Sequence, residues 1–301
     1  MERIQHIVVP TDFSTFSEAA AARAATFARL DGASIHLVHA VPFPLIVAPY
    51  EASLSPAVWE EVRRAARARI EEARKAVEAR GVSTVTAEVA DSGDPVAAIG
   101  AAVESHAADL IVMGTHGHGG LKHAFLGSVA ERTLRTALRP VLAVKEDVAS
   151  AEQPIQRILL AVDFSAHADR AVEVSAALAR RLAASVDVVH AFDLPLDYSP
   201  YTSDFGMELE QKIQASAAER LEGVRARLAE ARVTATLHSR RGHASQVIAE
   251  LAATLGTQLI VMGTRGNSGL AHVLLGSVAE RTLRTAPCSV LTVKADETSR
   301  A

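Results

Sequence analysis

The sequence predicts an α/β protein built from two tandem, doubly wound domains, each with a five-stranded parallel sheet covered by helices on both faces. Three observations lead to this fold. The chain has 301 residues, the length of two domains of about 150 residues each. Short apolar segments alternate with helical patterns, which is typical of parallel sheets joined by crossover helices. The segment 110–136 also returns at 259–285, and only six of the 27 aligned positions differ.

The first half contains five short apolar segments, which we predict to be strands at residues 4–9, 34–40, 82–89, 109–113 and 140–144. Helices are expected between them, at about residues 16–30, 56–80, 95–106 and 127–136. Ser14 or Thr15 can cap the first helix, and Asp94 precedes the third. Pro56 stands at the first position of the second helix, where proline is favoured. Strands and helices therefore alternate throughout the half.

Two segments show neither the helical nor the strand pattern of apolar residues. Residues 41–54 form an apolar stretch with three prolines, which is either a lid over a site or a packed connection. Residues 146–154 are polar, and we interpret them as the linker between a first domain at 1–148 and a second at 154–297. The second half is two residues shorter between its second strand and third helix. We place that shortening in the irregular stretch, because surface loops tolerate deletions.

A glycine motif follows the fourth strand of each half and precedes a helix. In the first half, Gly114 and Gly117 are separated by two residues, nine more precede Gly127, and Ser128 comes next. The second half keeps this spacing with Gly263, Gly266, Gly276 and Ser277. Glycine permits positive φ and close approach of the backbone, and a helix N-terminus attracts anions. The motif therefore predicts a phosphate site, and its repetition weighs against a plain connecting loop.

An acidic residue follows the first strand of each half, Asp12 in one and Asp163 in the other. A doubly wound sheet places its first and fourth strands side by side, and ligands bind beyond the carboxyl ends of such strands. The aspartate and the glycine motif should therefore meet. A carboxylate is a poor ligand for phosphate, but it can accept a hydrogen bond from an adenine amino group or a ribose hydroxyl. The alternative role is that of a helix cap.

The residues around the glycine motif favour binding over catalysis. The Lys-Ser/Thr pair of a Walker A loop is absent, and no paired histidine and carboxylate forms an evident hydrolytic base. His116, His118 and His123 could form a zinc site, but the second half offers only His272, without a carboxylate or cysteine beside it. We therefore assign no catalytic and no metal-binding residue, and we expect at most weak hydrolysis.

Composition narrows the class of protein further. The net charge is −4, and the arginines between residues 63 and 69 are flanked by glutamates, so we expect a solvated helix face rather than a nucleic-acid partner. The single cysteine, Cys288, enters an apolar run and is predicted to be buried. No apolar run approaches the length of a membrane span and no signal pattern opens the chain, so we expect a cytoplasmic protein.

Together these motifs resemble the universal stress protein family in its tandem form. The family motif G-x2-G-x9-G-[S/T] occurs in both halves, as do a first strand ending in PTDFS or AVDFS, a His-Ala pair after the second strand and the run LIVMGT. The resemblance covers essentially the whole chain. It implies the sheet order 3-2-1-4-5 and binding of ATP, alone or with Mg²⁺, at the switch point of each domain.

The resemblance also implies which positions contact the nucleotide. Aspartate would contact the adenosine, the residue after the second strand would offer its backbone to adenine, and the glycines and serine would hold ribose and phosphates. In the first half these positions and their neighbours are Pro10, Thr11, Asp12, Val41, Met113, Gly114, Gly117, Gly127, Ser128 and Val129. In the second half they are Ala161, Val162, Asp163, Phe192, Met262, Gly263, Gly266, Gly276, Ser277 and Val278. Phe192 departs from Val41 but leaves backbone contacts open.

The resemblance finally implies a regulatory or stress-response role with adenine nucleotide as the ligand. A slow ATPase or other nucleotide-dependent enzyme is one alternative, and a scaffold that docks to a partner protein without nucleotide is another. Because the family dimerises through its fifth strands, residues 141–145 and 290–294 are expected to pair within the chain as a pseudo-dimer, and whole chains are expected to form a homodimer. The protein partner is unknown.

Overall fold

The computed structural model describes residues 3–41, 56–90, 92–117, 126–145, 147–193, 203–266 and 275–295. The chain divides into two compact units, Arg3–Gln153 and Pro154–Ala301, which we call the N-terminal and C-terminal units. The predicted irregular stretch, apart from Val41, and the histidines at 118, 123 and 272 lie outside the described residues. Both units have the predicted α/β fold.

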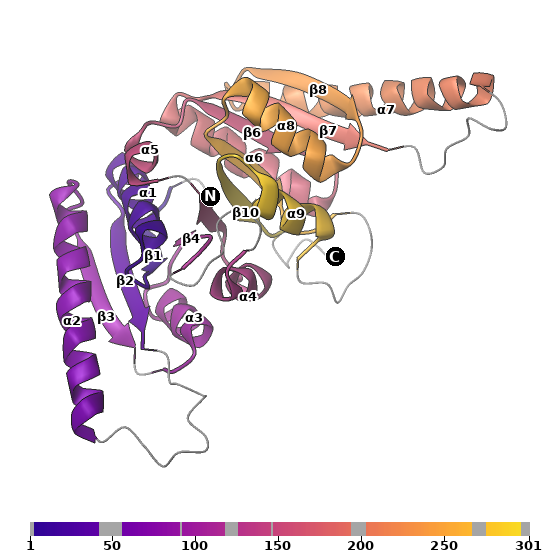
Figure 1. Ribbon diagram of the computed structural model, residues 1–301. Coiled ribbons are helices and arrows are strands. Elements are labelled where there is room, and N and C mark those ends of the chain that lie inside the picture. The colour runs from indigo at the N-terminus through magenta and orange to yellow at the C-terminus, as the bar shows by residue number, and fades with distance from the viewer. Residues whose placement is uncertain are drawn as a thin grey trace, which may run out of the picture. The chain divides into compact units, whose positions relative to one another are not determined.

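The N-terminal unit is a doubly wound parallel sheet. Its strands are β1 (His6–Pro10), β2 (Ser34–Ala40), β3 (Val85–Ala90), β4 (Leu110–Gly114) and β5 (Val141–Val144). They pair in the order β3-β2-β1-β4-β5, which confirms the predicted order. Its helices are α1 (Thr15–Asp31), α2 (Pro56–Ala79), α3 (Pro95–Ser105), α4 (Ser128–Thr136) and the short α5 (Val148–Glu152). Helices α1 and α2 cover one face, and α3 and α4 cover the other (Figure 1).

The C-terminal unit repeats this arrangement. Its strands are β6 (Arg157–Ala161), β7 (Ser185–Phe192), β8 (Ala235–Arg241), β9 (Leu259–Gly263) and β10 (Ser289–Val293). Their order is β8-β7-β6-β9-β10, again with every pair parallel. Its helices are α6 (Ala166–Leu182), α7 (Ser203–Glu230), α8 (Ala244–Leu255) and α9 (Ser277–Thr285). The chain therefore carries the same fold twice.

Local signals explain where the first helix of the N-terminal unit begins and ends. The Ser14 hydroxyl accepts a hydrogen bond from the Ser17 backbone N–H and so caps α1. Gly32 ends the helix with φ of 69°, a conformation that glycine adopts without steric cost. Between these ends, the alanines of α1, such as Ala20 and Ala24, are fully buried, which lets the helix pack closely on the sheet.

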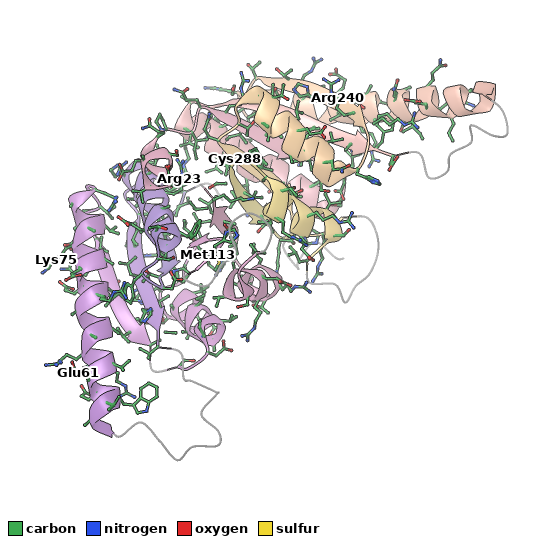
Figure 2. The ribbon with its side chains drawn as sticks, viewed as in Figure 1. Arg23, Glu61, Lys75, Met113, Arg240 and Cys288 are labelled. Atoms are coloured by element: carbon green, nitrogen blue, oxygen red, sulfur yellow. The ribbon has the colours of Figure 1, made fainter. Side chains whose placement is uncertain are left out.

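The arginine-rich part of α2 is a solvated face, as predicted. Glu61 and Lys75 project from the outer side of the helix (Figure 2). Arg64 forms an ion pair with Glu61, and Arg67 lies 3.5 Å from the Glu60 carboxylate. Cys288 is buried, which confirms the prediction for the single thiol.

The predicted linker is in part a helix. Residues 148–152 form α5, which packs on α1 and belongs to the N-terminal unit. Arg23, which is 2% exposed, donates from its guanidinium to the carbonyl oxygens of Ser150 (3.0 Å) and Gln153 (2.8 Å) (Figure 2). The segment is too short to show helical periodicity, and its anchor lies far away in the sequence. For these reasons the sequence pattern missed it.

The two-residue shortening of the second half lies elsewhere than predicted. Ala79 and Glu230, the last residues of α2 and α7, are still 151 positions apart, as are the matching residues before the irregular stretch. The first residues of β3 and β8 are 150 apart, and those of α3 and α8 are 149 apart. One residue is therefore lost before β8 and one between the start of β8 and α8. The prediction was wrong because it assigned the loss to the least regular segment.

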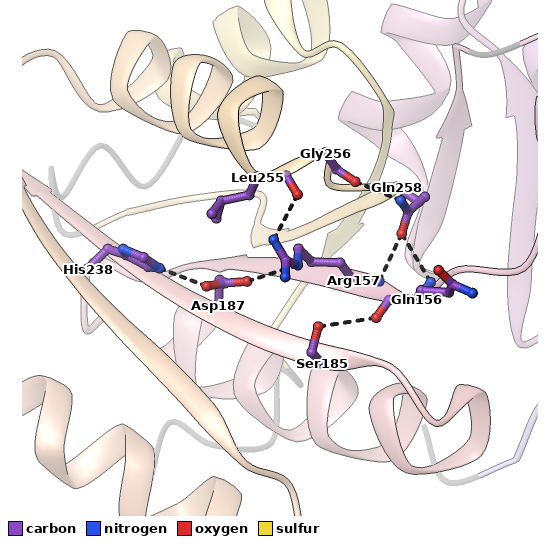
Figure 3. Close-up of polar contacts among 8 residues, drawn as sticks. All are labelled: Gln156, Arg157, Ser185, Asp187, His238, Leu255, Gly256 and Gln258. Atoms are coloured by element: carbon purple, nitrogen blue, oxygen red, sulfur yellow. Dashed lines mark hydrogen bonds and ion pairs between the residues drawn. The ribbon is translucent and has the colours of Figure 1, made fainter.

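A polar network in the C-terminal unit joins β6, β7 and β8 (Figure 3). Asp187 is buried; it contacts His238 Nε2 at 2.8 Å and lies 3.7 Å from Arg157 Nε. The Gln258 side-chain oxygen accepts hydrogen bonds from the backbone N–H groups of Gln156 and Arg157. Because Arg157 is the first residue of β6, the network lies toward the amino ends of the strands. It therefore lies at the opposite ends of the strands from the candidate site.

Candidate functional site

The candidate site of the N-terminal unit lies beyond the carboxyl ends of two neighbouring strands. β1 pairs with β4 in parallel, with Ile7 opposite Leu110, so the residues after both strands emerge at the same edge. A pocket of about 670 Å³ opens there. Nine of the ten predicted contact residues line it: Pro10, Thr11, Asp12, Met113, Gly114, Gly117, Gly127, Ser128 and Val129. Val41 is the exception, although its neighbour Ala40 lines the pocket.

The glycines of the motif are required for close contacts. A Cβ on Gly114 would lie 2.9 Å from the backbone of Phe16, at the start of α1. A Cβ on Gly117 would lie 2.5 Å from Asp12 Oδ2, and one on Gly127 would lie 3.2 Å from the Thr115 carbonyl oxygen. The sequence also suggested positive φ, but none of these three glycines has it. Close approach, rather than left-handed backbone, explains the motif.

Asp12 is held in a turn that leaves one oxygen toward the glycines. Its Oδ1 accepts hydrogen bonds from the Ser14 backbone N–H (3.0 Å) and the Ser14 hydroxyl (2.5 Å). Oδ2 is the atom next to Gly117. The N-cap of α1 is Ser14, so the alternative role of Asp12 as the cap itself is wrong. Asp12 instead orients the capping serine and presents Oδ2 at the pocket edge.

Phe13 shapes the same turn, and the sequence reasoning did not find this role. Its φ is 64°, which is unusual for a bulky residue. The ring packs between the His39 imidazole, with centroids 4.3 Å apart, and the Arg69 guanidinium at 4.4 Å. Phe164 has φ of 62° and similar partners, His190 at 4.5 Å and Arg220 at 4.1 Å. A phenylalanine after the aspartate in both halves was the available signal.

His39 connects the second strand to this turn. Its Nδ1 donates a hydrogen bond to the Thr11 carbonyl oxygen at 2.7 Å, and the residue lines the pocket. Burial lowers the pKa of His39 below its ordinary value, although the bond to Thr11 acts in the opposite direction. The position of His39 therefore favours the neutral form of its imidazole.

The far side of the pocket is the start of α4. Gly127 is the N-cap and provides no side chain to cap the helix, while Ser128 is the first helical residue. The first N–H groups and the Ser128 hydroxyl can therefore serve a bound anion. His116 instead pairs its Nδ1 with the Thr115 hydroxyl at 2.9 Å and packs against Phe16. Among the described residues, no cluster of three metal-ligating side chains occurs.

The C-terminal unit has a matching but smaller pocket of about 290 Å³. Nine of its ten predicted residues line it: Ala161, Val162, Asp163, Met262, Gly263, Gly266, Gly276, Ser277 and Val278. Asp163 Oδ1 accepts from the Ser165 N–H at 3.1 Å and hydroxyl at 2.6 Å, as Asp12 does from Ser14. Cβ atoms on the glycines would meet the corresponding neighbours. The aspartate turn and the glycine motif therefore have the same arrangement in both units.

Phe192 is the residue that the structure does not bring to the smaller pocket. It is buried and forms the last residue of β7, where it pairs with Arg241. Its carbonyl oxygen accepts a hydrogen bond from the Gly242 N–H at 2.8 Å. This hydrogen bond uses one of the two lone pairs of the carbonyl oxygen, and the expected contact between the backbone of Phe192 and a ligand stays a prediction.

The fold and the site define a class of protein: doubly wound α/β domains with a glycine loop and a helix N-terminus beyond the carboxyl ends of the first and fourth strands. Comparison with known families makes the assignment specific. The model of the universal stress protein family matches residues 3–145 and again residues 154–294. The chain belongs to the universal stress protein family, in tandem form.

Curated relatives agree with this assignment. The chain is 31% identical over 297 residues to a universal stress protein of Mycolicibacterium smegmatis, with 96% of each chain covered. It is 38% identical over 144 residues to a universal stress protein of Methanocaldococcus jannaschii, which covers 46% of this chain and 81% of that one. A solved universal stress protein from Archaeoglobus fulgidus is similar over 97% of this chain and 98% of its own, with 25% identity and a TM-score of 0.68.

Proposed function

We propose that the protein binds ATP at the switch point of its units and acts as a regulatory protein in a stress response. The observation that carries the proposal is the pocket of the N-terminal unit, where the glycine motif, a helix N-terminus and an aspartate meet at one edge. Family membership supports the same reading.

The groups of the pocket suit successive parts of a nucleotide. Gly117 and Ser128 would hold the phosphates through their backbone N–H groups and the serine hydroxyl, while Gly127, whose own N–H donates to the Thr115 carbonyl oxygen, lets the start of α4 approach that segment closely. Asp12 would accept a hydrogen bond from the ribose or adenine through Oδ2, the oxygen that faces Gly117 at the pocket edge. Val41 would meet the adenine edge with its backbone. An accompanying Mg²⁺ would take its ligands from phosphate and water, since the described residues offer no carboxylate cluster.

Binding, rather than turnover, is the proposed biochemical output. Within the described part of the N-terminal pocket, the titratable side chains that line it are Asp12, His39 and His116. Asp12 and His39 are each engaged in the turn that follows β1, and His116 pairs with Thr115. The nucleotide would therefore act by stabilising one conformation of the protein, which a partner protein then recognises.

Isothermal titration with ATP tests the proposal. We expect the intact chain to bind ATP and the double variant Gly117→Val with Gly266→Val to lose at least about two orders of magnitude in affinity, about 2.7 kcal/mol. Gly117 is preferable to Gly114, because a side chain at Gly114 would strike the backbone of α1 and disturb folding. Absence of ATP binding to the intact chain, or undiminished binding to the double variant, would contradict the proposal and favour a scaffold that needs no nucleotide.

Assembly is proposed separately. We propose that whole chains form a homodimer, as the family resemblance implies, and sedimentation velocity would measure it. A single species with the mass of one chain at micromolar concentration would contradict the dimer. In the part of the chain that the structure describes, no helix is long and apolar enough to cross a membrane.

A further inference from the structure

A further pocket of the C-terminal unit lies at the opposite ends of the strands from the glycine motif. It has a volume of about 540 Å³ and is formed where α6 ends and where β6, β7 and β8 begin. We call it the amino-end pocket. All the residues that line it belong to the C-terminal unit, and none of them lines the pocket at the glycine motif. It is therefore a separate cavity.

The charged side chains that line the amino-end pocket are three arginines, Arg157, Arg180 and Arg232, and one carboxylate, Asp187. The carboxylate is already engaged, because it contacts His238 Nε2 at 2.8 Å and lies 3.7 Å from Arg157 Nε (Figure 3). Within the described part of the chain, the guanidinium groups of Arg180 and Arg232 have no hydrogen bond or ion pair. Two cations of this pocket are therefore available to a ligand.

Arg232 stands at a position where glycine is the favoured residue. Its φ is 61°, in the left-handed region that disfavours any residue with a Cβ. The matching residue, two positions after the end of α2, is Gly81, with φ of 84°. The arginine thus keeps an unfavourable backbone conformation, and its guanidinium forms no bond to the described residues that would offset it. Residues held in such conformations cluster at ligand sites.

The replacement of glycine by arginine also accounts for the second available cation. In the N-terminal unit, Arg29 of α1 donates from Nη1 to the Arg80 carbonyl oxygen at 2.6 Å. A Cβ on Gly81 would lie 3.4 Å from Arg29 Cδ, so a side chain there crowds this arrangement. Arg180 is the matching residue of α6, and it makes no such bond beside Arg232 within the described segments. Both guanidinium groups therefore remain at the pocket.

We propose that the amino-end pocket binds a small soluble anion that carries two phosphate groups, one for each of Arg180 and Arg232. A guanidinium group presents N–H donors in a planar fork that matches phosphate oxygens. Thr234 and Thr236 line the same pocket, and their hydroxyls can donate to further oxygens, of which a diphosphate has more than a dicarboxylate. The volume is that of small-molecule sites in general. The proposal does not depend on nucleotide binding at the glycine motifs.

Hydrogen exchange of the full chain, read by mass spectrometry with increasing pyrophosphate, tests the proposal because it reports where the ligand binds. We expect pyrophosphate to slow exchange in residues 179–187 and 232–236. In Arg232→Gly the concentration that gives half of this protection should rise at least about tenfold, because a hydrogen bond to a charged group is lost. Glycine tolerates the positive φ, so this variant should melt no lower than the intact chain. Weaker binding would then not be a consequence of unfolding.

Two controls make the test specific. Arg225→Gln removes an arginine of α7 that pairs with Glu222 outside the pocket lining, and it should leave the protection by pyrophosphate unchanged. Succinate, a dicarboxylate, should protect the same residues only at concentrations at least about tenfold higher than pyrophosphate.

Three results would overturn the proposal. They are absence of protection in residues 179–187 and 232–236 of the intact chain, undiminished protection in Arg232→Gly, and equal protection by succinate and pyrophosphate. Failure of ATP to bind at the glycine motifs would be a distinct result, because exchange in these two segments reports the amino-end pocket alone.

Discussion

The two pockets of this chain share the residues of the glycine motif and differ in volume. The glycines, the aspartate turn and the start of the following helix have the same contacts in both units. The volumes are about 670 Å³ and about 290 Å³, and His39 and Ala98 line the larger pocket, whereas their counterparts His190 and Val247 are not among the described residues that line the smaller one. A nearly identical glycine motif therefore does not by itself set the volume of the pocket.

The comparison extends to the first helix of each unit, where the largest effect is expected. Arg23 of α1 is replaced by Val174 in α6, and both side chains are buried. Arg23→Val should destabilise the N-terminal unit by about 3 kcal/mol, because two carbonyl oxygens of the α5 segment lose a charged donor. Hydrogen exchange read by mass spectrometry would locate the loss in residues 148–153. Arg23→Lys is the matched control, and an unchanged exchange pattern in Arg23→Val would contradict the anchoring role.

The second prediction makes the larger pocket resemble the smaller one. Ala98→Val introduces the side chain that α8 carries at Val247 and should weaken ATP binding in the N-terminal pocket about tenfold, or about 1.4 kcal/mol. The measurement is calorimetric and uses the Gly266→Val background, so that one pocket is observed. Binding of tripolyphosphate should stay within about threefold, because the glycine end is untouched. An equal loss for both ligands would mean that the valine disturbs the whole pocket.

The third prediction concerns what the two units share. Phe13 and Phe164 both have positive φ, so an alanine there keeps the backbone strain and loses the stacked ring, whereas glycine removes the strain. Phe13→Gly should therefore be more stable than Phe13→Ala by about 1 kcal/mol in urea unfolding. The same order is expected for Phe164. Reversal of the order in either unit would show that φ does not limit stability at this turn.

The smallest expected effect depends on pH and distinguishes the two sheets. His36 of β2 is 5% exposed and stacks on His106, while Asp187 occupies the equivalent place in β7. Burial, with a smaller contribution from His106, lowers the pKa of His36, although Glu88 opposes this. Because the unfolded chain binds the proton more readily, stability is complete above the ordinary histidine pKa and falls as the pH drops below it.

Substitution of this histidine provides the control. In His36→Gln the N-terminal unit should lose less stability between pH 7 and pH 5 than in the intact chain, measured by urea unfolding at each pH. An unchanged pH dependence in His36→Gln would assign the effect to other groups.

Much of this structure follows from local sequence patterns. The helix starts and the meeting of Asp12 with the glycine loop could be predicted, because they depend on periodicity, capping residues and the general rule for parallel sheets, whereas the full strand order was implied by the family resemblance. The repetition of the glycine spacing was the strongest single guide, since two copies rarely keep a spacing without a shared constraint. Position by position, the pockets collect the residues that the motif indicated, with Val41 and Phe192 as exceptions.

What could not be predicted depends on contacts between distant segments. The helix α5 is fixed by Arg23, which lies more than 120 residues earlier, and no local pattern reveals that anchor. The pairing of Phe192 depends on the length of a connection fifty residues further along the chain. From the sequence, phenylalanine at 192 in place of valine at 41 does not affect a backbone contact. The pairing with β8 shows that the Phe192 carbonyl oxygen already accepts a hydrogen bond from Gly242. The difference between the pockets is therefore a tertiary property.

Native mass spectrometry of the intact chain with ATP most directly tests the central claim, that the glycine motif of each unit binds a nucleotide. With saturating ATP, the account predicts two ATP molecules bound to the intact chain and one bound to each of the variants Gly117→Val and Gly266→Val. No ATP bound to the intact chain, or two ATP molecules bound to either variant, would contradict the account.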